Sequence, residues 1–264
     1  MKYKILIITV LLISIVATLI FIIDSKNKNL ELYAIKYGDS LYHSKHIYYK
    51  DALNKPLPFA WMFYVIRYGE KIILVDTGFR KESLIVSYDI DHKDPLSLLK
   101  KININSSQVT DVIITHSHFD HIGNVDRFIN AKIYIQKDEL ENLKKYSKNQ
   151  EILDFLENNE NLITFDETYT LYNLFKIEKI GGHTIGSSVV SFSYKNKNYI
   201  LTGDECYLLD NCQGKPIGTY YDIEKNKKFI EKIKEIANKL ILTFHDPLIF
   251  DKYQKIDDSI IKIF

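Results

Sequence analysis

A cluster of histidine and aspartate side chains follows directly after a short apolar run, and it constrains the fold more than any other feature. Residues 112–114 read Val-Ile-Ile, and the next positions place His116, His118, Asp120 and His121 within six residues. A short buried strand that ends in a tight loop is a rigid platform from which such side chains can converge. Imidazole and carboxylate groups together suit zinc and similar first-row ions. The sequence therefore predicts a metal site, of the catalytic kind, at the end of a strand.

Four further acidic or imidazole side chains follow other predicted strands. They are Asp76, His183, Asp204 and His245. Each comes directly after, or within a few residues of, an apolar or β-branched run that ends in a turn. Since each lies where a strand finishes, we expect these side chains to gather with the opening cluster on one edge of the sheets.

The chain has 264 residues, of which 46% are hydrophobic, as expected for one sizeable globular domain. Runs of strands with helices between and after them predict a layered α/β protein with two sheets. Pro56 and Pro58 mark an expected loop. We expect strands at 30–37, 61–68, 71–75, 112–115, 131–135, 162–165, 175–180, 188–194, 199–202 and 240–244, and helices at 95–101, 138–146, 151–158 and 223–240.

The combined pattern resembles the metallo-β-lactamase superfamily, over essentially all of the chain after about residue 29. The resemblance implies a four-layer αβ/βα sandwich with two divalent metal ions, expected to be Zn²⁺, at one edge of its paired sheets. Carried over to this sequence, the ligands of the first metal are His116, His118 and His183, those of the second are Asp120, His121 and His245, and Asp204 bridges both. The resemblance also implies that Asp76 orients ligands by hydrogen bonding.

A narrower resemblance links the chain to the N-acyl-homoserine lactonases of this superfamily. It rests on Tyr207, three residues after Asp204, although Ile185 and Ser187 depart from the residues common in relatives. It implies that a hydroxide bridging two metals opens a lactone or related ester, with Tyr207 facing the substrate carbonyl and Asp120 carrying a proton. The alternatives are another superfamily hydrolase, such as a thioesterase or a β-lactamase-like enzyme, and a diiron redox or metal-binding module.

Charge and cysteine content limit the possible partners. The formal net charge of +1 gives no electrostatic reason to expect a nucleic acid, so a small-molecule substrate is expected. Cys206 and Cys212 are the two cysteines, and they could pair across a short loop or remain free. The aromatic stretch at residues 59–64 is assigned to the core, with lining of a substrate pocket as the alternative. No oligomeric state is predicted.

The N-terminal segment differs in composition from the rest of the chain. Residues 5–23 contain no charged side chain, and as one helix they would reach about 28 Å, close to the hydrocarbon thickness of a bilayer. They predict a membrane anchor over residues 1–28 and a hydrolase domain over 29–264, held outside the cytoplasm because Lys2 and Lys4 favour an inside N-terminus. A cleaved signal peptide, giving a secreted protein, is the alternative.

Overall fold

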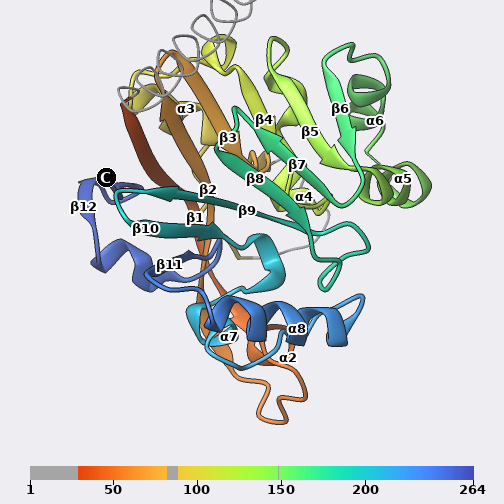
Figure 1. Ribbon diagram of the computed structural model, residues 1–264, viewed down its shortest axis with the longest axis vertical. Coiled ribbons are helices and arrows are strands. Elements are labelled where there is room, and N and C mark those ends of the chain that lie inside the picture. Colours follow the sequence, from red (N-terminus) through yellow and green to blue (C-terminus); the bar gives the residue numbers. More distant parts are fainter. Residues whose placement is uncertain (1–28, 82–88, 148) are drawn as a thin grey trace, which may run out of the picture.

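The computed structural model describes residues 29–81, 89–147 and 149–264, and two β-sheets dominate this part of the chain (Figure 1). An eight-stranded sheet has the order β12 (Gln254–Asp257), β13 (Ile260–Lys262), β1 (Leu30–His43), β2 (Pro56–Tyr68), β3 (Lys71–Val75), β4 (Asp111–Ile113), β5 (Lys132–Gln136) and β6 (Leu162–Phe165). A five-stranded sheet has the order β11 (Lys239–Leu242), β10 (Lys197–Leu201), β9 (Ser188–Tyr194), β8 (Phe175–Lys179) and β7 (Thr168–Leu171).

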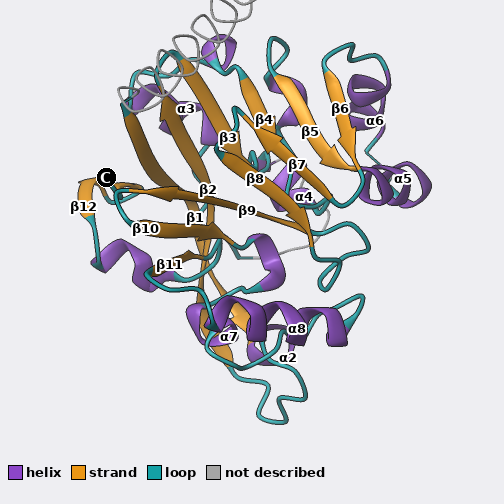
Figure 2. Ribbon diagram, viewed as in Figure 1, coloured by secondary structure: helices purple, strands orange, loops and turns teal. Residues whose placement is uncertain are grey.

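The α-helices are α2 (Ser44–Ile47), α3 (Pro95–Lys101), α4 (Phe119–Ile122), α5 (Lys137–Tyr146), α6 (Gln150–Glu157), α7 (Leu209–Cys212) and α8 (Ile223–Lys234). Helices α3, α5 and α6 pack on the eight-stranded sheet and α8 packs on the five-stranded sheet, whereas the short α4 lies at the ends of the strands (Figure 2). Short 3₁₀ turns are η2 (Ser106–Gln108), η3 (Val125–Arg127), η4 (Gly203–Glu205) and η5 (Pro247–Asp251). Among these turns, η4 begins two residues after the end of β10 and carries Asp204.

The alternation of side chains along the strands explains the layers. On β1, Tyr33 and Ile35 point into a hydrophobic cluster shared with α3, α5 and α6, whereas Leu32 and Ala34 point into a second cluster between the two sheets. A third cluster joins the five-stranded sheet to α8, which contributes Phe229, Ile230 and Ile233. The order is therefore helices, sheet, sheet, helix, and the predicted mixed α/β sandwich is confirmed.

Parallel pairing determines where the loops with polar residues emerge. Strands β3, β4 and β5 pair in parallel, and so do β10 and β11 in the other sheet. Parallel neighbours finish at the same edge, which brings the residues after their carboxyl ends close together. This edge is where the sequence predicted the metal site.

Several predicted boundaries are wrong for identifiable reasons. Pro56 and Pro58 belong to β2 rather than to a loop, because the start of β2 pairs with the end of β1 (His43 opposite Pro56) in a long antiparallel ribbon. Pro56 is tolerated there because it is the first residue of the strand. The last long helix ends at Lys234 instead of residue 240, and its apolar pattern continues into a turn before β11. The short strands β7, β12 and β13 were not predicted.

The predicted membrane-spanning helix requires a correction. In the described parts of the chain no helix is both long enough and apolar enough to cross a bilayer. The segment at residues 5–23 to which the prediction referred lies outside the described residues.

Candidate metal centre

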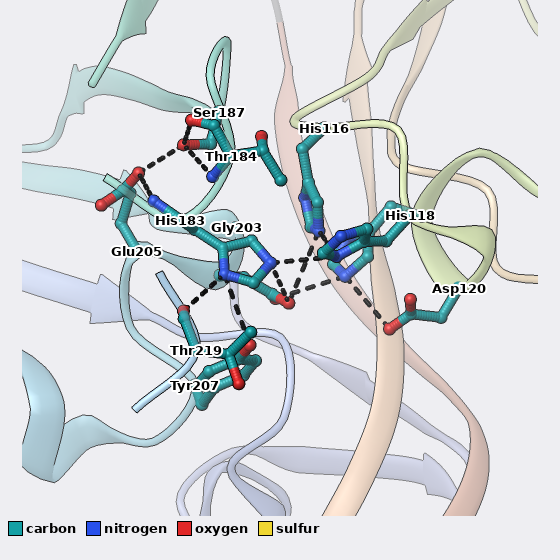
Figure 3. A network of polar contacts seen from close by, with 12 residues as sticks. His116, His118, Asp120, His183, Thr184, Ser187, Gly203, Glu205, Tyr207 and Thr219 are labelled. Carbon is teal, nitrogen blue, oxygen red and sulfur yellow. Dashed lines mark hydrogen bonds and ion pairs between the residues drawn. The ribbon is translucent and has the colours of Figure 1, made fainter. Parts of the chain in front are cut away.

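Seven histidine and aspartate side chains converge at the shared edge of the two sheets. They form two groups, His116, His118, His183 and Asp204, and Asp120, His121, Asp204 and His245. Within each group the potential ligand atoms all lie within 4.8 Å of one another. These are the seven residues that the sequence assigned to the metals, and the structure brings all of them together. Part of the arrangement is visible in Figure 3.

The first cluster has His118 at its centre. His118 Nδ1 lies 3.0 Å from His116 Nε2 and 3.0 Å from His183 Nε2. Asp204 Oδ2 lies 3.5 Å from His116 Nε2 and 3.4 Å from His183 Nε2. Three imidazole nitrogens and one carboxylate oxygen therefore surround one point. His118 is exposed, whereas His116 and His183 are buried.

The second cluster uses the other oxygen of Asp204. Asp204 Oδ1 lies 3.2 Å from His121 Nε2 and 3.0 Å from His245 Nε2. Asp120 Oδ2 lies 3.2 Å from His121 Nε2 and 3.6 Å from His245 Nε2. One carboxylate thus presents one oxygen to each cluster, and its bridging of two metals stays a prediction.

Hydrogen bonds behind the imidazoles determine which ring nitrogen faces the centre. His183 Nδ1 lies 3.0 Å from the Thr219 carbonyl oxygen, and His245 Nδ1 lies 2.8 Å from the Ala60 carbonyl oxygen. Because a carbonyl can only accept, each Nδ1 carries the proton and donates it. The Nε2 lone pair of each ring is then free to bind a cation.

Asp76 supports the second cluster from behind. Its carboxylate accepts hydrogen bonds from the backbone N–H and the hydroxyl of Thr115, each at 2.7 Å, and lies 2.7 Å from His121 Nδ1. Asp76 has φ = 66°, an uncommon conformation for a residue other than glycine. The orienting role predicted for Asp76 agrees with these contacts.

Electrostatics at the centre favour a cation. Burial lowers the pKa of His183 to about 4 and lowers that of His116 well below its usual value, so both rings are neutral. Burial opposes charge on Asp204, but the neighbouring imidazoles of His121 and His245 hold its pKa well below the usual range. Burial also lowers the pKa of His121, yet the carboxylates around it outweigh this effect and raise its pKa well above normal. The neutral rings of His116 and His183 beside buried negative charge suit a divalent metal ion, and binding of a second ion at His121 would release the proton that this ring holds.

Three buried atoms show that these residues fit metal ions. His121 Nε2, His245 Nε2 and Asp204 Oδ1 are buried from solvent and make no hydrogen bond within the described residues, so the close contacts among these three atoms are their only polar contacts apart from Asp120. Buried polar atoms rarely stay unpaired in folded proteins because desolvation is costly. Their convergence, and a donor set of imidazoles and carboxylates, match a zinc-like ion.

A cavity of about 200 Å³ opens above the two clusters. Its wall includes Tyr42, Phe59, Trp61, Phe119 and Tyr207. The Phe59 ring stacks on His245 with a centroid separation of 4.2 Å, so this aromatic side chain restrains the imidazole as well as lining the cavity. Phe59 and Trp61 line this cavity and also belong to the first hydrophobic cluster, the core assignment made for residues 59–64.

The family model described as the metallo-beta-lactamase superfamily matches residues 62–211, more than half of the chain. The chain belongs to the metallo-beta-lactamase superfamily. Among curated members with similar sequences is an N-acyl homoserine lactonase of a Bacillus species, which is 24% identical over 191 residues and aligns with 67% of this chain and 76% of that protein.

Solved structures confirm the superfamily fold. An N-acyl homoserine lactone hydrolase, with the product N-hexanoyl-L-homoserine bound at its catalytic metal centre, superimposes with a TM-score of 0.73 at 21% identity, over 86% of this chain and 97% of the other. A dizinc quorum-quenching lactonase gives a TM-score of 0.63 at 20% identity, over 84% of this chain and 90% of the other. Hydrolases with metal centres therefore share the architecture of this superfamily member.

Three residues around the centre were not identified from the sequence. The buried Tyr37 hydroxyl donates to the Asp120 carbonyl oxygen at 2.8 Å, and the buried carboxylates Glu139 and Glu205 contact the loops that carry histidines. Glu205 adjoins Asp204 in the sequence, a local signal that could have identified it. Tyr37 and Glu139 lie far from the motif along the chain, and only the fold brings them to it.

Cys206 and Cys212 form a disulfide, which resolves the choice that the sequence left open. The bond closes a short loop that includes Tyr207. Both cysteines are buried and pack with α8 in the third hydrophobic cluster. The disulfide therefore joins η4, which carries Asp204, to α7 on the far side of Tyr207.

Proposed function

We propose that the protein is a metal-dependent hydrolase that opens lactones or related carboxylic esters. The observation that carries this proposal is the convergence of seven potential ligands beneath a cavity whose wall includes Tyr207. Superfamily membership and the lactonases among its relatives support it. Zinc is the expected metal because the donor set combines imidazole nitrogens with carboxylate oxygens.

Two ions are expected from the arrangement of the side chains. His116, His118 and His183 would hold one, Asp120, His121 and His245 would hold the other, and Asp204 would contact both. Divalent ions in such a site supply hydroxide near neutral pH and polarise a carbonyl oxygen. The remaining steps depend on the protein's own side chains.

Tyr207 and Asp120 have suitable positions for two of these steps. The Tyr207 side chain lines the cavity, and its hydroxyl would donate a hydrogen bond to the carbonyl oxygen as that oxygen becomes negative. Addition of hydroxide to the carbonyl carbon is followed by cleavage of the ester C–O bond. The Asp120 carboxylate would accept the proton of the newly added hydroxyl group and pass it to the departing alkoxide oxygen. The aromatic wall would limit the entry of bulk water.

A second cavity suggests the shape of the substrate. It measures about 430 Å³, adjoins the first, and shares His118 and Phe119 with it. Leu143 and Ile152 contribute apolar side chains to its wall. A substrate with a compact polar head near the metals and an apolar chain in this second cavity would fill both, as an acylated lactone does.

Hydrolysis by the purified full-length chain tests the proposal. With zinc added, the protein should open N-acyl-homoserine lactones to the hydroxy acid, measured as acid release, and a chelator should abolish the activity. β-Lactam, thioester and phosphodiester substrates serve as comparisons under the same conditions. A fully metal-loaded protein that opens neither lactones nor simple esters contradicts the proposed function.

A further inference from the structure

The loop that carries His183 packs against two buried carboxylates that belong to neither metal cluster. Glu205 Oε1 accepts hydrogen bonds from the backbone N–H groups of Gly182 (2.9 Å) and His183 (3.0 Å), as Figure 3 shows in part. Glu139, from the first turn of α5, contacts the same loop from the other side, through Thr184 and Gly186. The His183 loop is therefore held between two carboxylates from different elements of the fold.

Glu139 connects this loop to the loop of the opening motif. Its Oε1 accepts from the backbone N–H of Ser117 at 2.8 Å and from the Ser117 hydroxyl at 2.5 Å. Its Oε2 accepts from the Thr184 hydroxyl at 2.6 Å and from the Gly186 N–H at 2.9 Å. Ser117 lies between His116 and His118, and Thr184 follows His183. Each oxygen thus anchors one of the two loops that supply the histidines of the first cluster.

The packing around Glu139 leaves little freedom for either loop. A Cβ atom placed on Gly186 would lie 2.6 Å from both Glu139 Cβ and Glu139 N, so only glycine allows this approach. The Glu139 backbone is itself fixed, because its N–H donates to the Gln136 side chain at 2.9 Å at the start of α5. Glu139 is fully buried, and water cannot replace any of these bonds.

We propose that Glu139 is a positioning residue for the first metal cluster, one that sets the affinity of His116, His118 and His183 for their ion. The proposal rests on the metal centre of the proposed function. Residues that orient metal ligands by hydrogen bonding commonly change the affinity for the metal by 10–100-fold when they are replaced. Glu139 acts on three histidines at once through two loops, and it should influence the second cluster much less.

The carboxylate is required because both oxygens face obligate donors. The N–H groups of Ser117 and Gly186 can only donate, and they lie on different oxygens of Glu139. In Glu139→Gln the side chain offers one oxygen and one NH₂ group, so one of the two loops must face a second donor. That loop loses its anchor while the volume and position of the side chain are kept.

Zinc binding to the full-length protein tests this role. Zn²⁺ alone is titrated against a competing chromophoric chelator, which gives two dissociation constants. For Glu139→Gln we expect one of the two zinc dissociation constants to increase about 10–100-fold and the other to change by less than about threefold. In the His183→Ala background, where the first cluster is already broken, Glu139→Gln should have little further effect.

Asp111 provides a matched control. It is another fully buried carboxylate, bonded to the hydroxyls of Tyr134 (3.0 Å), Tyr172 (2.7 Å) and Thr110 (2.6 Å) at the opposite end of β4. Asp111→Asn and Asp111→Ala should both lower the thermal stability of the protein, one by less and one by more than Glu139→Gln does. Both variants should leave the two zinc dissociation constants unchanged. Equal losses of zinc affinity in all three variants would overturn the positioning role, because general destabilisation would then explain them.

The remaining outcomes separate the two proposals. Failure of the wild-type chain to bind zinc contradicts the metal centre and the proposed function. If the wild type binds two zinc ions and Glu139→Gln binds them with the same dissociation constants, the inference about Glu139 alone is overturned.

If Glu139→Gln does not fold, the Thr184→Val variant decides the question, because it removes one hydrogen bond from a hydroxyl to Glu139 and keeps the shape of the side chain. It should weaken the same zinc constant severalfold, and an unchanged constant contradicts the proposal.

Discussion

Asp76 Oδ2 lies 2.7 Å from His121 Nδ1, and both side chains are buried from solvent. The other oxygen of Asp76 accepts from the backbone N–H of Thr115, directly before His116. Asp76 belongs to neither cluster, so it acts on the second cluster through the ring of His121. Asp76 thus contacts a ring of the second cluster directly, whereas Glu139 contacts the loops that carry the histidines of the first cluster.

Replacing Asp76 should weaken the second cluster selectively. Asp76→Asn keeps one acceptor oxygen but cannot serve both Thr115 and His121, so the His121 ring loses its orientation. We expect zinc affinity at one site to fall about 10–100-fold and kcat to fall with it. Chelator competition measures the affinity, and Asp111→Asn serves as the control. Unchanged zinc binding in Asp76→Asn would show that this hydrogen bond does not orient the ligand.

The hydroxyl of Tyr207 can be tested apart from its ring. Tyr207→Phe keeps the buried ring and removes the hydroxyl that would face the substrate carbonyl. We expect kcat for lactone opening to fall about 10–100-fold, since loss of one oxyanion donor has an effect of this order or greater. KM and zinc content should change little. A variant with full kcat rules out the oxyanion role and leaves Tyr207 as a packing residue.

The second cavity predicts a preference for apolar chains. Asn142 is half-buried in its wall, and Asn142→Trp should fill it without disturbing the core. Glu141→Trp places the same side chain at an exposed neighbouring position and is the control. The ratio of kcat/KM for decanoyl over butyryl homoserine lactone should fall at least severalfold in Asn142→Trp only. An equal ratio of kcat/KM values in both variants would place the acyl chain of the substrate outside the second cavity.

The disulfide should stabilise the metal-free protein. The Cys206–Cys212 bond closes a loop with a sequence separation of 6, for which chain entropy predicts about 2 kcal/mol. The Cys206→Ala/Cys212→Ala variant should lose about this much free energy of unfolding in urea, measured without zinc. Unfolded, unreduced wild type should show no free thiol. Two free thiols in that sample contradict the pairing.

The ligands could be predicted from the sequence because each is marked locally. Four of the ligands lie within six residues of one another, namely His116, His118, Asp120 and His121. Each of the others follows a strand at a turn. Strand ends in parallel sheets converge by geometry, so local signals were sufficient to bring distant residues together. The layers were predictable for a similar reason, since alternating apolar residues on β1 and its neighbours identify two buried faces.

The contacts behind the ligands could not be predicted in the same way. Glu139 lies in a helix whose polar pattern is typical of a solvated surface, and its burial depends on how α5 meets the His183 loop. The start of β2 at Pro56 depends on pairing with the far end of β1. The cysteine pairing also required the position of α7. Each of these features is set by tertiary packing and leaves little trace in the local sequence.

Anomalous scattering at the zinc edge, from crystals of the zinc-loaded full-length protein, tests the central claim most directly. The account predicts two peaks on either side of Asp204, one among His116, His118 and His183, and one among Asp120, His121 and His245. No peak at this edge of the sheets, or zinc bound only at other residues, would contradict it.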